Sequence, residues 1–269
     1  MIDLHTHILP GIDDGSPDME TSLEMARIAA AHQTKFIFAT PHYIQGALEN
    51  RREKVLEHCE AFNRELASLG IGLTVLPGCE LFICPEAPEL VEEGTVSALG
   101  ATSLVLVEFP MMSVPVYTDE VLYRMKLKGF QPVLAHPERN REIAANPDIL
   151  YHLVKRGILA QVNSTSITGL YGKTVQKTAL SLIRHHLVHF AASDAHTCRG
   201  RSPKLEQASA LVRDKFGDET AERLFFGNAR AFLDGLEPEL PEPMRVTSSR
   251  VFLGGDIFGS LRKLMTHMF

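Results

Sequence analysis

The chain has 269 residues, of which 45% are hydrophobic and 22% charged, with a formal net charge of −6. This size suits one large domain with a sizeable core, since α/β barrels commonly reach it as a single domain. The acidic balance argues against a broad nucleic-acid-binding face, and no apolar run approaches the ~20 residues of a membrane span.

The cysteines and the first residues bear on the compartment. Four cysteines, Cys59, Cys79, Cys84 and Cys198, show no C-x-x-C pair or other paired framework. Reduced thiols in the cytoplasm are the simpler interpretation of such a set. Asp3 and His5 stand where a secretory leader would have its charged and then apolar run. We therefore expect a cytoplasmic protein without a signal peptide or transmembrane segment.

Strand-like runs alternate with helix-like runs along most of the chain. Strands are predicted at residues 3–5, 36–40, 73–80, 103–108, 131–136, 158–163 and 188–194, and helices at residues 16–33, 51–69, 118–128, 149–156, 173–185, 204–216 and 219–226. Ser16 is the candidate N-cap of the first helix, with Pro17 at its first position.

Seven strands with crossover helices imply a parallel sheet. Residues 104–107 are apolar on both faces, as buried parallel strands require. Closure into a barrel is the natural solution for this length and alternation. We expect a (β/α)7 barrel over residues 1–236, irregular because some connections are long, with an open doubly wound sheet as the alternative.

The end of the chain has a different pattern. Residues 237–243 alternate glutamate with proline and leucine, which predicts a stiff, extended linker. Beyond it, one face of a short helix would carry the apolar side chains of Ile257, Phe258, Leu261, Leu264, Met265 and Met268. This segment could pack on its own barrel, or dock onto a neighbouring subunit, a kinase partner or a membrane surface. A homo-oligomer is therefore left open.

The predicted strands share one feature, which is that nearly all end in an imidazole or a carboxylate. His5 and His7 lie two apart, so both point to one side of the first strand. The corresponding residues of the later strands are His42, Glu80, Glu108, His136, Asn163, Asp194 and His196. In a parallel barrel the C-terminal ends of all strands meet on one face, where active sites sit. Residues that merely mark strand ends would be a mixture of Ser, Thr, Asn, Lys and Gly, whereas this set has five histidines and three acids, so it predicts a metal site.

Six short motifs make the pattern specific. They are Asp3-Leu-His-Thr-His7, Ala39-Thr-Pro-His42, Gly78-Cys-Glu80, Glu108-Phe-Pro110, Ala135-His-Pro-Glu-Arg139 and Ser193-Asp-Ala-His196. In order, spacing and strand context they resemble the PHP (polymerase and histidinol phosphatase) superfamily. The resemblance, over about residues 1–235, is closer to the bacterial metal-dependent protein-tyrosine phosphatases of capsule and exopolysaccharide operons. It implies a distorted (β/α)7 barrel of the PHP type with two to three divalent ions, most often manganese, with iron and zinc as alternatives.

The resemblance also implies how the ligands are shared. One ion would be held by His5, His7, Glu80 and Asp194. A second would be held by Glu80, Glu108 and His136, with Glu80 bridging the two. A third would be held by His42 and His196 with an acid from the loop at residues 13–14. Asp14 is preferred because it precedes Gly15 as in the family's Asp-Gly pair, and Asp13 is the alternative.

Such a site suits phosphoryl transfer, because closely spaced ions lower the pKa of a water molecule and neutralise the phosphoryl oxygens. Arg139 and either Arg199 or Arg201 could grip the phosphate with a two-pronged guanidinium, and by resemblance Arg201 is preferred. Tyr43 and Tyr117 could line an aromatic substrate pocket, although packing in the core or at the rim fits them equally.

Three functions remain open from the sequence. The first is a tyrosine phosphatase acting on a phosphotyrosine-bearing protein, such as the autophosphorylated tail of a tyrosine kinase. The second is a small-molecule phosphatase such as histidinol-phosphate phosphatase, and the third a non-enzymatic or nuclease-like PHP module, which the complete ligand set and the acidic charge disfavour. A cysteine-dependent mechanism is excluded, because Thr197 separates Cys198 from His196 and position 204 is Lys rather than Arg.

Overall fold

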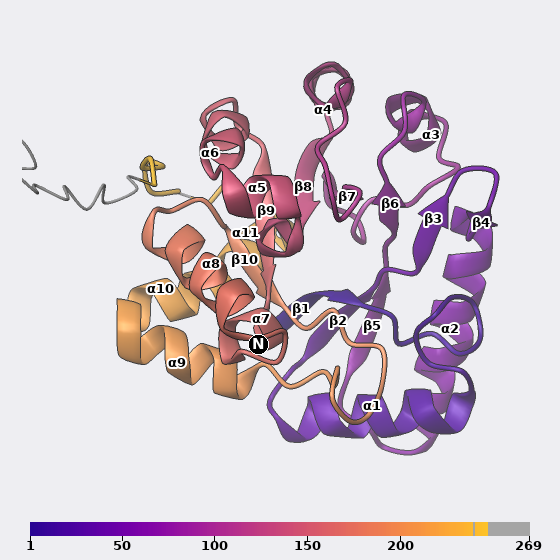
Figure 1. The fold of residues 1–269 in the computed structure, drawn as a ribbon. Helices are drawn as coiled ribbons and strands as arrows, with labels where there is room; N and C mark the ends of the chain where they lie inside the picture. The colour runs from indigo at the N-terminus through magenta and orange to yellow at the C-terminus, as the bar shows by residue number, and fades with distance from the viewer. Residues whose placement is uncertain (239, 247–269) are drawn as a thin grey trace, which may run out of the picture.

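The structure, a computed structural model, describes residues 1–238 and 240–246. Its strands lie at the centre of the molecule with the helices around them (Figure 1). One parallel sheet has the order β1 (Ile2–Thr6), β2 (Phe36–Ala39) and β5 (Thr74–Pro77). The other has the order β10 (Phe190–Ala192), β9 (Leu159–Asn163), β8 (Gln131–Ala135), β7 (Leu104–Glu108), β6 (Glu80–Phe82), β3 (His42–Ile44) and β4 (Leu48–Glu49).

The two sheets join into a distorted (β/α)7 barrel. On one side, the Asp194 amide donates to the His5 carbonyl and the His7 amide to the Ala195 carbonyl, both at 2.8 Å, which links β1 to the chain leaving β10. On the other side, the chain passes from β2 to β3 and from β5 to β6, so two chain segments each contribute to both sheets. The predicted barrel is confirmed.

The strand predicted at residues 36–40 is confirmed to within one residue, whereas the strand predicted at residues 73–80 is wrong in detail, because it is interrupted. Residues 36–40 stop before Pro41 and the chain resumes pairing as β3, while residues 73–80 stop at Pro77 and resume as β6. Proline has no N–H to give to a ladder, so both breaks fall at a proline. His42 and Glu80 consequently open a strand of the second sheet, where they are paired in register, rather than closing a strand of the first.

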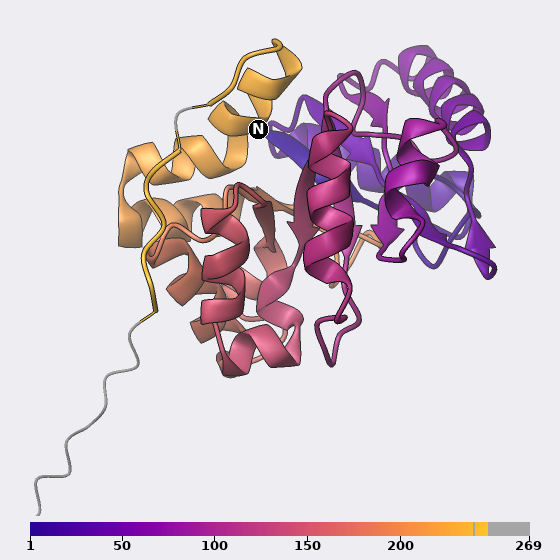
Figure 2. The same cartoon turned by 90° about the horizontal axis from the view of Figure 1, so that it is seen from above.

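The helices cover the outside of the barrel (Figure 2). They are α1 (Met19–Ala31), α2 (Arg52–Ser68), α3 (Ala87–Glu92), α4 (Thr118–Leu127), α5 (Arg141–Ala145), α6 (Asp148–Lys155), α7 (Ser164–Thr168), α8 (Lys173–Arg184), α9 (Glu206–Phe216), α10 (Asp218–Glu222) and α11 (Asn228–Leu233), with a 3-10 turn at Pro137–Arg139 and a π turn at Arg223–Gly227. Ser16 was predicted to cap α1, but this prediction is wrong. The Asp18 carboxylate accepts from the Thr21 amide at 2.8 Å, and the helix starts after it.

Alternation along the strands separates the barrel interior from the layer beneath the helices. On β7, Leu104 and Leu106 pack in one apolar cluster, whereas Val105 and Val107 pack in another, which contains residues of α3, α4, α6 and α8. Glu108 continues the interior row of β7, since side chains two apart share a face. The interior is thus apolar at its base and ends in polar side chains at the carboxyl end of the strands.

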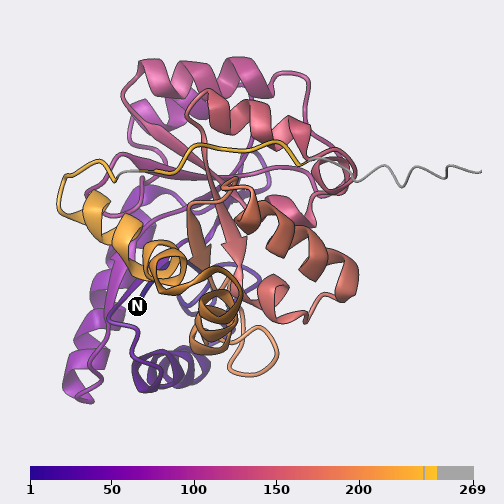
Figure 3. The same ribbon diagram turned by 90° about the vertical axis from the view of Figure 1, so that its left-hand side faces the viewer.

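The described part of the C-terminal segment lies against the barrel. The Met244 amide donates to the His185 carbonyl at 2.9 Å, and Arg245 pairs with Asp148 at 2.8 Å. Figure 3 shows this yellow stretch running across the face turned to the viewer. The predicted amphipathic face at residues 257–268 lies outside the described residues. In the part of the chain that is described, no helix is long and apolar enough to cross a membrane.

Candidate metal centre

The predicted ligands converge at the carboxyl end of the barrel from every part of the chain. Most of their side chains are buried, and His5 and His7 expose no more than 1% of their surface. Two of them, His136 (φ 32°) and Asp194 (φ 51°), adopt left-handed backbone conformations that non-glycine residues seldom take. Such strain is typical of functional sites, where the surrounding structure holds a side chain in a required direction.

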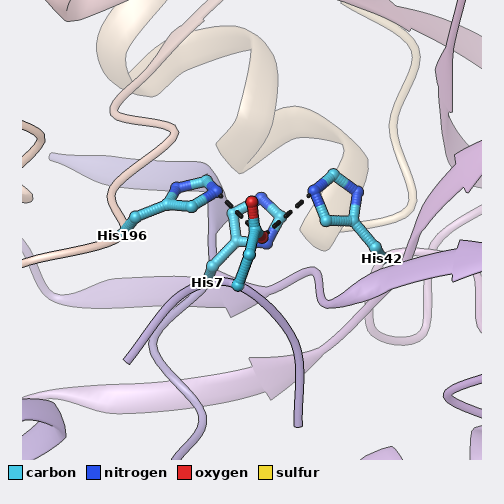
Figure 4. Close-up of side chains that lie close together, drawn as sticks. His7, His42 and His196 are labelled. Atoms are coloured by element: carbon cyan, nitrogen blue, oxygen red, sulfur yellow. Dashed lines mark ion pairs between the residues drawn. The ribbon is translucent and has the colours of Figure 1, made fainter. Parts of the chain in front are cut away.

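A first group joins three histidines around one carboxylate. Asp14 Oδ1 lies 3.3 Å from His42 Nε2 and 3.3 Å from His196 Nε2. Figure 4 shows His7 between His42 and His196, with dashed lines marking these two ion pairs. His7 belongs to the same group of donor atoms, all within 4.8 Å of one another. The resemblance had placed His7 only with the first ion.

A second group surrounds the Glu80 carboxylate. Its Oε2 lies 3.1 Å from His5 Nε2 and 3.2 Å from His7 Nε2. The Nε2 atoms of the two histidines are themselves only 3.1 Å apart. Asp194 Oδ1 stands 3.6 Å from each of the same two nitrogens. These four residues are the set expected for the first ion.

A third group extends from Glu80 to Glu108. His136 Nε2 lies 2.9 Å from Glu80 Oε1 and 3.7 Å from Glu108 Oε1. His42 Nδ1 lies 3.1 Å from Glu80 Oε2 and 3.8 Å from Glu108 Oε2. Glu80 therefore takes part in both of the last two groups, which is the geometry that a bridging ligand needs.

Asp13 and Asp14 have different partners, which separates the two alternatives left by the sequence. Asp13 Oδ2 accepts from His7 Nδ1 at 2.7 Å, on the side of the ring away from the group. Asp14 instead points to His42 and His196. Gly15 follows because a Cβ there would overlap the carbonyl oxygen and Cβ of His7. The geometry favours Asp14 as the ligand and Asp13 as the residue that orients His7.

The electrostatics of the cluster favour added positive charge. Burial alone would raise the pKa of Glu80, but the neighbouring His5, His136 and His7 hold it well below its usual value. Burial would lower the pKa of His7, yet Asp13 and Glu80 together raise it to about 10. The pKa of Asp194 falls to about 2, because the charges of His5 and His136 outweigh its burial. Ionised carboxylates concentrated in this way attract a cation.

The donor set fits divalent ions. Neutral imidazole and carboxylate, which make up all three groups, are ligands of zinc, manganese and iron. His42 Nδ1 is a specific observation in favour of a metal. It is buried and close to two carboxylates, yet it makes no hydrogen bond. A buried ring nitrogen beside two carboxylates that makes no hydrogen bond suits an ion shared with them. A neutral imidazole has one lone pair, so His42 can give it to the third group through Nδ1 or to the first group through Nε2, but not to both.

Both predicted arginines reach the centre. Arg139 Nη1 lies 2.9 Å from Asp194 Oδ2, and Arg201 Nη2 lies 2.7 Å from Asp194 Oδ1. Arg201 Nε is buried and has no hydrogen-bond partner, so it remains able to donate. The aromatic ring of Tyr171, which the sequence did not point to, lies under the Arg139 guanidinium at 4.7 Å.

The structure contradicts a substrate-binding role for Tyr43. Its side chain is 1% exposed and packs in the apolar core with Cys79 and Leu81. The reason is alternation on β3, because His42 faces the metal centre and its neighbour must face the opposite side. Tyr117 also stays outside the centre, with its hydroxyl donating to the Ile83 carbonyl at 3.3 Å.

Comparison with known proteins identifies the family of this chain. The family model for capsular polysaccharide synthesis, CpsB/CapC, matches residues 1–234. The chain belongs to the CpsB/CapC family. It is 42% identical to tyrosine-protein phosphatase YwqE of Bacillus subtilis (strain 168) over 219 residues, which is 81% of this chain and 86% of YwqE. It is 29% identical to tyrosine-protein phosphatase CpsB of Streptococcus agalactiae serotype III (strain NEM316), over 87% of this chain and 98% of CpsB.

A solved structure extends the comparison to the fold. It belongs to a set of crystal structures of YwqE from Bacillus subtilis and CpsB from Streptococcus pneumoniae, which are metal-dependent tyrosine phosphatases. Its TM-score is 0.89 at 39% identity, covering 92% of this chain and all of the other. The predicted resemblance to metal-dependent tyrosine phosphatases of the capsule family is confirmed. The two structures share one fold over the whole of the matched chain.

Proposed function

We propose that this chain is a metal-dependent phosphatase that hydrolyses phosphotyrosine on a protein, namely the autophosphorylated tail of a bacterial tyrosine kinase that controls capsule or exopolysaccharide synthesis. The observation that carries the proposal is the convergence of five imidazoles and four carboxylates beside two guanidinium groups. The likeness to the CpsB/CapC phosphatases supports the same reaction. A cytoplasmic location fits the free cysteines and the substrate.

Two or three divalent ions fit the three groups of donors, with manganese as the first choice and iron or zinc as alternatives. Their ligands would be His5, His7, Asp14, His42, Glu80, Glu108, His136, Asp194 and His196. When bound, such ions supply a water molecule of lowered pKa and neutralise the charge of the phosphoryl oxygens. The protein itself holds the ligands in fixed positions, with the side chains of His5 and His7 buried at the base of the centre.

The arginines belong to the open side of the centre. The Arg139 and Arg201 side chains are 20% and 29% exposed, and the Asp14 carboxylate is 65% exposed. A phosphate that enters from this side meets both guanidinium groups before it reaches the buried histidines. Their N–H donors can grip the phosphoryl oxygens and hold the ester for in-line attack. An exposed tail that bears phosphotyrosine can reach such an open centre.

Substrate preference tests the proposal. With Mn²⁺ present, kcat/KM for a phosphotyrosine peptide should exceed that for histidinol phosphate, because the open side accommodates a protein tail. The two values should be measured side by side on the same preparation. A clear preference for histidinol phosphate would replace the protein-phosphatase function with a small-molecule one. Failure to hydrolyse either ester in metal-loaded protein would contradict phosphatase activity altogether.

A further inference from the structure

Two buried amides connect two of the proposed metal ligands. Gln161 and Asn163 lie on β9 and expose none of their surface. They are two residues apart, so both face the barrel interior above Leu159. The remaining interior and outward positions of this strand are apolar. Burying an amide costs free energy unless its hydrogen bonds are made, so two of them at one strand end require partners.

The partners form an unbroken chain of hydrogen bonds. Asn163 Nδ2 donates to Asp194 Oδ2 at 2.6 Å. Gln161 Nε2 donates to Asn163 Oδ1 at 2.9 Å. At the far end, Gln161 Oε1 lies 3.0 Å from Nδ1 of His5. The chain therefore runs from Asp194 through both amides to His5, and we call it the amide relay.

The Asp194 carboxylate decides which group donates and which accepts in each hydrogen bond of the relay. An ionised carboxylate only accepts, so Asn163 must turn its NH2 group to Asp194 and its oxygen to Gln161. Gln161 must then give its own NH2 group to Asn163, which leaves its oxygen facing His5. An amide oxygen also only accepts, so Nδ1 of His5 must carry the proton. In the neutral ring, which is the form that binds a metal, Nε2 of His5 is then left with the lone pair, and that nitrogen is the one beside Glu80 and His7.

We propose that Gln161 and Asn163 are positioning residues that hold His5 in the tautomer able to bind a metal ion and fix the Asp194 carboxylate beside it. This inference rests on the proposed function, since it concerns the same centre. Hydrogen bonds behind a ligand fix its orientation and raise its basicity, and losing one typically weakens metal binding by about 10- to 100-fold. The relay does this for a histidine and a carboxylate at once.

Metal affinity tests the relay without reference to turnover. Mn²⁺ binding should be measured by competition with a chromophoric chelator for Gln161→Met, Asn163→Leu and the double variant. Both substitutions nearly keep the side-chain volume and remove the hydrogen bonds. Each single variant should bind about 10- to 100-fold more weakly. The double variant should bind little more weakly than either single one, because breaking any link breaks the whole chain.

Two further variants test whether the effect comes from the hydrogen bonds of the relay. Gln161→Asn keeps the amide but is one methylene shorter, so it cannot reach both partners and should weaken binding even if the apolar variants fail to fold. Asn228→Leu is the matched control, since Asn228 is a buried amide that donates to the His189 carbonyl at 2.7 Å away from the centre. It should lower stability and leave Mn²⁺ affinity unchanged.

The outcomes separate the relay from the proposed function. Failure of the unchanged protein to bind Mn²⁺ would overturn both. Tight binding by the unchanged protein and by every folded relay variant would overturn the relay alone. If the losses in Mn²⁺ binding free energy of the two single variants add up in the double variant, the relay would also be overturned. The two amides would then act through independent contacts and not through connected hydrogen bonds. Coupled losses, absent in Asn228→Leu, are the expected result.

Discussion

Replacing Glu80 with Gln should lower turnover of a phosphotyrosine peptide by at least ~10³-fold. Its carboxylate stands within 3.2 Å of nitrogens from His5, His7, His42 and His136. An amide keeps the size of the side chain but has one acceptor and no charge, so it can neither bridge two ions nor offset their charge. The loss should appear in kcat with the overall circular dichroism unchanged, and bound metal should fall with it.

Glu138 provides a matched control for this substitution. Its side chain is as buried as that of Glu80, with 1% exposed. Its Oε1 accepts a hydrogen bond from the backbone N–H of Asn163 at 3.0 Å. Burial raises the pKa of Glu138, whereas the neighbouring histidines lower that of Glu80, so the loss of a charge to glutamine should cost less at Glu138 than at Glu80. Glu138→Gln should therefore keep metal content and activity near those of the unchanged protein. Equal losses in both variants would show that burial, rather than ligation, explains the effect at Glu80.

Replacing Arg139 with Ala should lower turnover by at least ~10²-fold while leaving the metals bound. An arginine that grips a transferring phosphoryl group typically supplies several kcal/mol of transition-state stabilisation. Arg139 is held for that task between Asp194 and the ring of Tyr171. Steady-state kinetics and metal analysis on one preparation measure the two effects separately.

Two further variants at this turn sharpen the interpretation. Arg139→Lys should restore activity only in part, because an ammonium cannot make a two-pronged contact with phosphate. Arg141→Ala removes an exposed arginine two residues further along and should change little. If Arg139→Ala loses its metals, the residue serves the ligand Asp194 rather than the substrate, and its role as a phosphate grip would be wrong.

The barrel and the convergence of the candidate ligands could be predicted because both depend on strong local patterns. Apolar runs such as residues 104–107 predict buried strands, and the topology of a parallel barrel then carries the strand ends to one face. The topology alone predicts that His5 lies close to Asp194, 189 positions further along the chain, and the two side chains are 3.6 Å apart. The resemblance added the grouping of the ligands, although it did not place His7 with His42 and His196.

What could not be predicted depends on exact side-chain direction. From the sequence, Tyr43 could line the substrate pocket or pack in the core. Neighbouring residues of a strand face opposite ways, so beside His42 its aromatic ring belongs to the core. Asn163 was noted at the end of its strand but given no role, and Gln161 was overlooked, because amides are poor metal ligands. Their spacing on β9, with Gln161 and Asn163 two apart, repeats that of His5 and His7, and this was the available signal.

The most direct test of the metal mechanism is a titration of the chelated, dialysed protein with Mn²⁺, following bound ions and phosphotyrosine-peptide turnover in the same samples. We expect almost no turnover without metal, and recovery in step with the filling of two to three sites per chain. The buried donors of the centre make such stoichiometric binding the natural result. Full turnover by protein that holds no divalent ion would contradict the mechanism.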